Sequence, residues 1–269
     1  MIADLVLLER RDGVAVLTLN DRNRRNALSL DISERLSELV AECEHDESIG
    51  AVVVTGAPPA FCGGADLTTL GEAREDGLRA IYAGFLAVAN CTLPTIAAVG
   101  GHAVGAGLNL ALACDVRLAG PRAVFDARFL QLGLHPGGGM TWMIQRIAGP
   151  QTAMAMTVFG QMLDGREAER TGLALRMVDG DHDALVAAAT ALAAPAAAAP
   201  RELVITTKRS MRATASLDEH AEAVEVELVA QLESMKSPAF TELVARMREK
   251  ISKRTRGDRP PQRSSEGHN

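Results

Sequence analysis

The stretch from Thr95 to Gly120 constrains the fold of this chain more than any other part of its sequence. It begins with a short run, TIAAV, that is apolar on both faces, as expected of a buried strand. From Ala106 the apolar spacing becomes helical and continues until Asp115. Between them lie glycines, which let the backbone turn sharply or approach another segment closely: Gly100, Gly101, Gly105 and Gly107. A strand, a glycine turn and a buried helix start leave backbone N–H groups free, and such donors suit a developing negative charge.

Other interpretations of this stretch are weaker or stay open. The segment from Leu93 to Cys114 contains no Asp, Glu, Lys or Arg, but its proline, its glycines, His102 and Asn109 make it a poor lipid-facing helix. A dinucleotide-binding fingerprint fails, because its third glycine would fall on Leu110. Close packing of a core helix with no functional role stays open.

Composition excludes several classes of function. Apolar residues make up 47% of the 269 residues but aromatic residues only 3%, and the net charge is −6, which argues against a nucleic-acid surface. The N-terminal residues lack the basic start and long apolar core of a signal peptide. The cysteines are scattered without metal-ligand spacing, which predicts reduced core thiols: Cys43, Cys62, Cys91 and Cys114. We therefore expect a soluble, cytoplasmic protein with no membrane span and no metal site.

A second glycine turn lies in the segment FCGGADL, Phe61 to Leu67. It follows the buried strand expected over Ala51 to Thr55, and Gly63 and Gly64 allow a tight turn. Asp66 is placed to cap whatever follows. Two turns of this kind in one domain can aim two N–H donors at one oxygen, which is the geometry of an oxyanion hole.

The N-terminal part combines a predicted hairpin with a basic loop. Strand-like runs over Asp4 to Glu9 and Val14 to Leu19 flank a turn at Asp12 and Gly13. The loop that follows, NDRNRRNALS, carries three arginines that either meet a phosphate group or form a solvated surface: Arg22, Arg24 and Arg25. Ser29 at its end is a good N-cap for the helix that follows.

These motifs together resemble the crotonase superfamily, whose best-known members are enoyl-CoA hydratases. The matching segments, in the order of the family, are RRNALS, FCGGADL, AAVGGHAVGAGLNLALACDVRLAG, AVFDARFLQLGLHPGGG and DGREAERTGLALRMVD. The resemblance implies an α/β fold, a spiral of ββα repeats over residues 1–199. It also implies a helical C-terminal trimerisation region over residues 200–252.

The resemblance implies roles for particular residues. The two N–H donors of the oxyanion hole would belong to Ala65 and Ala106, and they would stabilise the enolate of an acyl-CoA thioester. At the second position the family usually has glycine, but the donor is the backbone. Coenzyme A, present as part of the substrate and not as a covalently bound cofactor, would contact Arg24, Arg25, Ala27, Gly64, Asp66, Leu67 and Phe240. Near the last of these, Lys236 or Lys250 is a further candidate.

Two residues depart from the hydratase pattern. A hydratase of this family uses one glutamate as base and another as acid, and in this chain Asn109 and Phe129 stand in their places. Asn has no titratable proton near neutral pH and Phe has no polar atom. Each positioned acid–base group raises the rate of such a reaction by roughly 10²–10⁴-fold. Because both are missing here, we expect no efficient hydration.

Another group would have to carry the proton if the protein is an enzyme. Asp126 and His135 are candidates near the second glutamate position, and His135 has a side chain suited to proton transfer near neutral pH. Structural roles are the alternatives: a hydrogen bond for His135, and a cap or a pair with Arg128 or Arg122 for Asp126. His102 is interpreted as a packing residue.

The C-terminal part predicts helices and a tail. Apolar residues recur at helical spacing from Leu217 to Met235 and from Phe240 to Ile251. The resemblance assigns these stripes to contacts in a homotrimer or a dimer of trimers, and packing on their own domain is the alternative. Residues 253–269 are basic and without pattern, which predicts a disordered tail.

Two hypotheses from different classes follow. The first is an acyl-CoA-binding enzyme with a complete oxyanion hole but no hydratase glutamates, acting as an isomerase, hydrolase or decarboxylase. The second is a non-catalytic carrier or sensor of acyl-CoA. A proton carrier that points into the pocket favours the enzyme, and an entirely apolar pocket favours the carrier.

Overall fold

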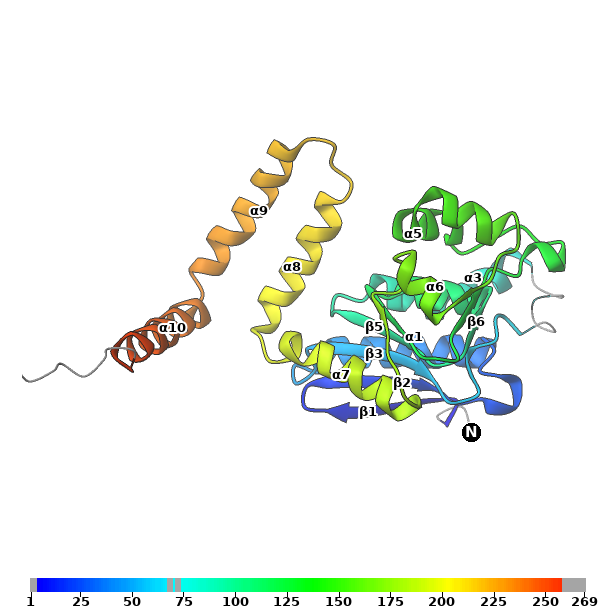
Figure 1. Cartoon of the computed structure of the whole chain (residues 1–269), viewed down its shortest axis with the longest axis horizontal. Helices are drawn as coiled ribbons and strands as arrows, with labels where there is room; N and C mark the ends of the chain where they lie inside the picture. The colour runs from blue at the N-terminus through cyan, green and yellow to red at the C-terminus, as the bar shows by residue number, and fades with distance from the viewer. Residues whose placement is uncertain (1–3, 67–69, 71–73, 258–269) are drawn as a thin grey trace, which may run out of the picture. The chain divides into compact units, whose positions relative to one another are not determined.

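A computed structural model describes residues 4–66, 70 and 74–257 of the chain. The chain divides into two compact units, Met1–Lys208 and Arg209–Asn269. The first holds the sheets and most of the helices, and the second is helical where it is described (Figure 1). Each unit is considered by itself below.

The main sheet of the first unit has six strands in the order β1-β2-β3-β5-β7-β10. Their bounds are β1 Val6–Arg11, β2 Val14–Leu19, β3 Ala51–Gly56, β5 Thr95–Val99, β7 Val116–Ala119 and β10 Arg176–Met177. β1 and β2 pair antiparallel, which confirms the predicted hairpin, and the other neighbours pair in parallel. Asp12 and Gly13 turn the hairpin with φ of 48° and 82°. β3 and β5 are buried along their whole length, as their uninterrupted apolar runs predict.

Helices cover both faces of this sheet, so its strands contribute alternate side chains to two apolar clusters. Val14, Val16 and Val53 face the cluster that includes α7 (His182–Ala197). Leu17 and Val54 face the larger cluster, which contains residues of the helices α1 (Leu30–His45), α3 (Glu75–Asn90), α4 (Ala106–Ala113), α5 (Met140–Thr157) and α6 (Gly165–Arg170). The other helical elements among the described residues of the first unit are η2 (Arg22–Arg24), η3 (Leu130–Leu132) and part of α8 (Arg201–Thr214).

A second, smaller sheet positions the loops of the candidate site. Its strand order is β4-β6-β8-β9, with β4 Ala60–Cys62, β6 His102–Val104, β8 Val124–Asp126 and β9 Leu163–Asp164. β4, β6 and β8 run parallel to one another. Because parallel strands end at the same edge of a sheet, the segments that follow Cys62, Val104 and Asp126 come together there.

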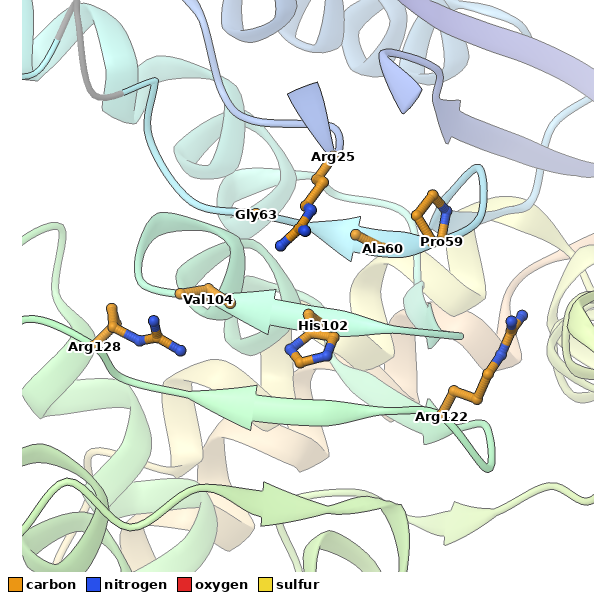
Figure 2. A pocket seen from close by; sticks show the side chains of 8 residues that line it. All are labelled: Arg25, Pro59, Ala60, Gly63, His102, Val104, Arg122 and Arg128. Carbon is orange, nitrogen blue, oxygen red and sulfur yellow. The ribbon is translucent and has the colours of Figure 1, made fainter. Parts of the chain in front are cut away.

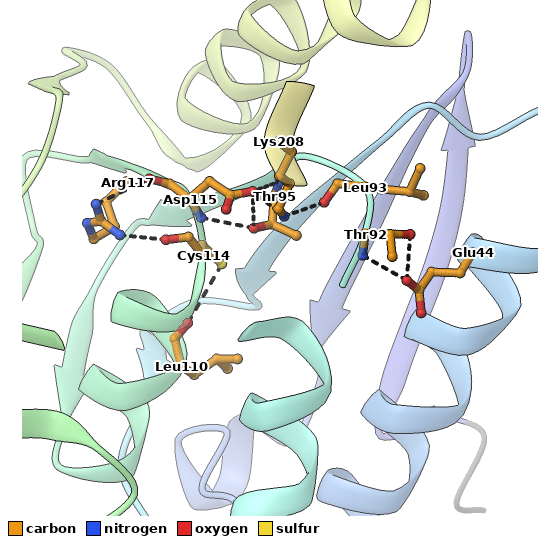
Figure 3. Close-up of polar contacts among 9 residues, drawn as sticks. All are labelled: Glu44, Thr92, Leu93, Thr95, Leu110, Cys114, Asp115, Arg117 and Lys208. Atoms are coloured by element: carbon orange, nitrogen blue, oxygen red, sulfur yellow. Dashed lines mark hydrogen bonds and ion pairs between the residues drawn. The ribbon is translucent and has the colours of Figure 1, made fainter. Parts of the chain in front are cut away.

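The central helix α4 is buried along its whole length, and polar residues secure its C-terminal end (Figure 3). The sequence places the end of this run at Asp115, but the helix ends at Ala113, and Asp115 accepts hydrogen bonds from the backbone N–H and hydroxyl of Thr95 at 2.8 and 2.9 Å. Lys208 pairs with the same carboxylate and donates to the Leu93 carbonyl oxygen at 2.6 Å. The helix is thereby tied to both β5 and α8.

The second unit contains α9 (His220–Met235) and α10 (Pro238–Gly257). The predicted stripe from Phe240 to Ile251 lies on α10, whereas the stripe from Leu217 to Met235 lies on α9 except for Leu217, which precedes that helix. α9 has no buried residue in the described chain. α10 ends at Gly257, beyond the start of the predicted tail, and residues 258–269 lie outside the described part. In that same described part, no helix alone is both long and apolar enough to cross a membrane. The pair α7 and α8 passes such a test together, but it bends by 104°.

We predict that Lys208→Ala lowers the free energy of unfolding by about 2 kcal/mol. The variant leaves Asp115 without the cation paired with it, but that carboxylate is 32% exposed, so the loss falls below the ~3–5 kcal/mol typical of fully buried pairs. Arg79→Ala, which breaks an exposed pair with Glu75 on α3, is the control and is expected to cost less than about 0.5 kcal/mol. Urea denaturation measures both, and equal losses in the two variants would contradict the prediction.

Candidate functional site

The first glycine turn follows β4 and leaves the N–H of Ala65 free. Gly64 has φ of 110°, a conformation that favours glycine. Its carbonyl oxygen accepts from the Leu28 N–H at 2.7 Å, and the Asp66 N–H donates to the Leu28 carbonyl oxygen at 3.0 Å. Because both neighbours of Ala65 bond to Leu28, the N–H of Ala65 points away from that segment. No acceptor within the described residues is bonded to it.

The second glycine turn follows β6 and begins α4. Gly105 has φ of 52°, and its N–H donates to the Asp126 carbonyl oxygen at 2.9 Å. Ala106 is the first residue of α4, so its N–H has no partner within the helix, and no bond from it to another described residue is present. The next residue must be glycine, because a Cβ on Gly107 would collide with the Cys62 carbonyl oxygen.

The two turns lie against each other. A Cβ placed on Gly64 would be 3.1 Å from the carbonyl oxygen of Val104, the residue before the second turn. Ala65 and Ala106 also line one cavity of about 430 Å³. The structure therefore brings together the two alanines that the sequence singles out.

The same cavity collects most of the other predicted site residues. Gly64, Asn109, Phe129 and His135 all line it, as do side chains of α3 that sequence reasoning did not assign to the site: Leu78, Ile81 and Tyr82. The helical spacing of α3 shows that these residues share a face, but not that the face borders a cavity. Tyr82 packs against Phe85 with ring centroids 5.3 Å apart, which makes part of this wall rigid and apolar.

Asn109 is a neutral, buried residue of the cavity. It is 1% exposed, and its Nδ2 donates to the Gly137 carbonyl oxygen at 2.8 Å. Its Oδ1 is buried and has no hydrogen-bond partner in the described chain. The residue holds the loop before α5 against α4, where a Cβ on Gly138 would lie 2.6 Å from Nδ2.

Phe129 and His135 lie at opposite ends of the loop that contains η3. Phe129 is half-buried and packs against the main core cluster, so it contributes apolar surface to the cavity. His135 is exposed, and its Nδ1 lies 2.7 Å from the Pro136 carbonyl oxygen. Of the two proton carriers considered from the sequence, it is the one that lines the cavity.

Asp126 is paired with Arg128, the structural alternative that the sequence left open. Its carboxylate is 2% exposed and accepts from Arg128 Nε at 2.7 Å, with Nη2 also in contact. Asp126 is not among the described residues that line the cavity. Because the cation next to it satisfies its charge, Asp126 is poorly placed to exchange protons with a ligand there.

A second cavity, of about 570 Å³, adjoins the first and is basic (Figure 2). It shares Gly63, Val104 and Arg128 with the first cavity. Its other charged or titratable lining residues are Arg25, His102 and Arg122. The interpretation of His102 as a packing residue is wrong, because this side chain is exposed on β6 while the next residue faces the core. We expected packing because a turn glycine precedes His102. The side chains of a strand alternate between its two faces, and this alternation points His102 away from the core.

The arginine loop splits into residues with different roles. Arg24 Nε donates to Asp21 at 2.6 Å, and its Nη1 is 3.6 Å from Asp66. Arg25 lines the basic cavity and has no carboxylate partner among the described residues. Ala27 follows these arginines in the chain and precedes Leu28, which forms an isolated β-bridge with Ala65.

Asn26 is a residue that sequence reasoning did not single out. It is fully buried, with φ of 57°, and its Nδ2 donates to the carbonyl oxygens of Ala57 and Ala60 at 2.9 and 2.8 Å. It therefore ties the arginine loop to the start of β4. The motif RRNALS was the available signal, because Asn tolerates the left-handed region better than most residues.

The remaining predicted positions have simple outcomes. Leu67 lies outside the described residues, and Phe240 is a partly exposed residue of α10 in the second unit. All four cysteines are free and buried, as expected, and burial raises the pKa of Cys62 and of Cys114 to about 12, so neither provides a thiolate. Among residues 4–66, 70 and 74–257, no group of His, Cys, Asp and Glu is arranged to hold a metal ion.

Comparison with known proteins identifies relatives of the whole chain. The sequence model of the enoyl-CoA hydratase/isomerase family matches residues 9–254. The probable enoyl-CoA hydratase EchA14 of Mycobacterium tuberculosis is 52% identical over 251 residues, which cover 90% of this chain and 96% of the relative.

Solved structures of similar proteins have the same fold. An enoyl-CoA hydratase from Bacillus anthracis superposes with a TM-score of 0.85 at 26% identity, over 91% of this chain and 96% of that one. A probable enoyl-CoA hydratase/isomerase from Mycobacterium abscessus superposes with a TM-score of 0.81 at 30% identity, over 91% of this chain and 96% of that one. These likenesses confirm the predicted family and the mixed α/β fold.

We predict that Gly107→Ala destabilises the protein by about 1–3 kcal/mol. The added methyl group would meet the Cys62 carbonyl oxygen and lie 2.8 Å from the Cys62 Cβ, so α4 would have to move away from β4. Thr141→Ala, at an exposed position of α5, is the control, because helix propensity there favours alanine by up to about 0.7 kcal/mol. Urea denaturation should therefore give effects of opposite sign, and an undiminished stability of Gly107→Ala would overturn the close packing inferred for the site.

Proposed function

The chain belongs to the enoyl-CoA hydratase/isomerase family, and from this premise we propose that it binds an acyl-CoA thioester and stabilises the thioester enolate. The N–H groups of Ala65 and Ala106 are the proposed donors to the thioester oxygen. The observation that carries this proposal is that both N–H groups lack acceptors in the described chain and belong to residues that line the same cavity. Donors fixed by a turn and by a helix start need no rearrangement when negative charge develops.

The walls of the cavity support an acyl group as the bound part. Leu78, Ile81 and Phe129 line it, and apolar surface of this kind favours a hydrocarbon chain over water. The basic cavity supports binding of coenzyme A, the other half of the proposed ligand. We assign the phosphate groups of coenzyme A to its arginines Arg25 and Arg122, since guanidinium groups bind phosphate through paired hydrogen bonds. Arg24, which is already paired with Asp21, is assigned a lesser part.

The protein is proposed to be a poor hydratase. Hydration requires a base to activate water and an acid to protonate the α-carbon, and no Asp or Glu lines the cavity among the described residues. Asn109 and Phe129, at the glutamate positions, are both in the cavity wall and cannot transfer protons. With these residues the site could still bind the thioester and stabilise the oxyanion electrostatically.

We predict that the purified protein binds butyryl-CoA but hydrates crotonyl-CoA at least about 10⁴-fold more slowly than a family member with both glutamates. The factor follows from the loss of two positioned acid–base groups. Titration calorimetry measures the binding, and the loss of the enoyl-thioester absorbance measures hydration. Rapid hydration would overturn the assignment of Asn109 and Phe129, and the absence of binding would overturn the proposed function.

Ala106→Pro tests the oxyanion hole directly. Proline removes the N–H but is tolerated at the first position of a helix, and Gly105 before it has no Cβ to clash. We expect about tenfold weaker binding of butyryl-CoA, the value of one hydrogen bond. Leu30→Pro, at the first position of α1, is the matched control and should bind as the unaltered protein does.

We also propose that the chain assembles into a homotrimer or a dimer of trimers through its second unit, where Phe240 would contact coenzyme A. In support, the apolar stripes of α9 and α10 are exposed in the single chain: Val224, Leu228, Leu232, Met235, Phe240, Leu243, Met247 and Ile251. Sedimentation is expected to give three or six times the chain mass of 28.4 kDa. A compact monomer at micromolar concentration would contradict this proposal.

A further inference from the structure

His102 projects into the basic cavity, and the function proposed above leaves it without a role. Its side chain is exposed while the next residue of β6 faces the core, and it lines the cavity. On the small sheet its neighbours are the apolar residues Ala60 of β4 and Val124 of β8. No hydrogen bond or ion pair joins the imidazole to another residue of the described chain. Its ring nitrogens are therefore available to a ligand.

The charged side chains that face His102 in this cavity are cations. Those of Arg25, Arg122 and Arg128 lie around the imidazole (Figure 2). They come from the loop after η2, from the turn between β7 and β8, and from the segment after β8. Among the described residues that line the cavity there is no Asp or Glu. A bound anion would therefore meet no carboxylate there.

The arginines differ in how much of their charge is already satisfied. Arg25 and Arg122 form no ion pair with a carboxylate of the described chain. Arg128 is paired with Asp126, which is buried and reaches the cavity only through this pair. His102 is the one described lining residue whose charge can change near neutral pH.

The ligand proposed for this cavity carries more negative charge than its arginines supply. Coenzyme A has a diphosphate and a separate phosphate monoester, and the monoester approaches two negative charges above its second pKa of about 6. Arg25 and Arg122 offer one positive charge each, while Asp126 offsets that of Arg128. Phosphate oxygens held between these arginines would face the imidazole of His102. A protonated ring is a charge-assisted donor to such oxygens.

We propose that a phosphate group of the acyl-CoA ligand accepts a hydrogen bond from protonated His102, so that binding takes up a proton and weakens as the pH rises. This inference rests on the function proposed above and adds His102 to the phosphate-binding residues. The proton comes from the solvent and stays on a ring nitrogen, and no covalent bond forms in the ligand. Because binding and protonation are linked, each favours the other by the same factor.

The direction of the pH dependence follows from the form that binds. The imidazolium donates to the anion, whereas a neutral ring adds no charge to the cavity. The affinity is therefore highest on the acidic side of neutrality and falls as the ring loses its proton. If His102 only shaped the cavity, or only contacted an arginine as a neutral ring, its replacement would change binding equally at every pH.

The test measures binding of butyryl-CoA to the full-length protein by titration calorimetry. The pH is varied from about 6.5 to about 8.5 at fixed ionic strength, because salt screens exposed charges. At the acidic end we expect His102→Asn to bind about tenfold more weakly than the unaltered protein, the value of one hydrogen bond to a charged group. At the alkaline end the two should agree within about twofold, since a histidine side chain is then largely neutral.

A second substitution separates charge from shape. His102→Lys keeps a positive charge over this whole range of pH, so it should bind with little dependence on pH. His45→Asn changes an exposed histidine at the end of α1, outside the cavity, and is the control. It should show the same pH profile as the unaltered protein.

Proton uptake is measured separately by titrating at about pH 7.5 in HEPES and in Tris, whose ionisation enthalpies differ. The unaltered protein should take up a fraction of a proton more per bound ligand than His102→Asn does. If butyryl-CoA binds but these two proteins share one pH profile or one proton uptake, the inference is overturned alone. If butyryl-CoA binds at no pH, the proposed function falls with it.

Discussion

The close contact between the first turn of α4 and the end of β4 is the constraint on which the candidate site depends. Gly107 lies so near the Cys62 carbonyl oxygen that no side chain fits between them. The contact fixes the start of α4 relative to the turn after β4, and so it sets the separation of Ala65 and Ala106. Because the donors belong to the backbone, their positions follow from the packing of two elements and not from rotamers.

The C-terminal end of α4, a helix without charged residues, is held by charged residues that follow it in the chain and by Lys208. Arg117 is buried and donates to the carbonyl oxygens of Cys114 and Leu173, both at 2.7 Å. A cation at the C-terminus of a helix satisfies orphan carbonyls and stabilises the helix dipole. Burial lowers the pKa of Arg117, but a guanidinium stays protonated in a protein. Together with the pair of Asp115 and Lys208, it holds the helix at the end away from the cavity.

The glycine turns of the site could be predicted from the sequence, whereas most of the side chains that line its cavities could not. Gly64 and Gly105 mark their turns because positive φ favours glycine there, and two such turns suggested paired N–H donors. The family resemblance assigned these donors to Ala65 and Ala106. The basic cavity escaped prediction, because Arg25, His102 and Arg122 come from separate segments that only the small sheet brings together. No spacing rule connects such residues, whereas Asp126 and Arg128 are oppositely charged and only two positions apart in the sequence, so their pairing was foreseeable.

Under the proposed function, the two cavities divide the binding of a thioester between backbone and side chains. The backbone turns would hold negative charge on the thioester oxygen, and that capacity depends on the glycines that shape the turns, Gly64, Gly105 and Gly107, and not on ionisable side chains. Which bond breaks is decided by the side chains that line the cavity. With Asn109 and Phe129 in the wall, proton transfer from carbon has no carboxylate partner among the described residues, while Arg128 adds a fixed positive charge. Under the proposed function, a site that keeps two backbone donors but has a neutral amide and an aromatic ring in its wall is suited to binding a thioester, and not to moving a proton through a carboxylate.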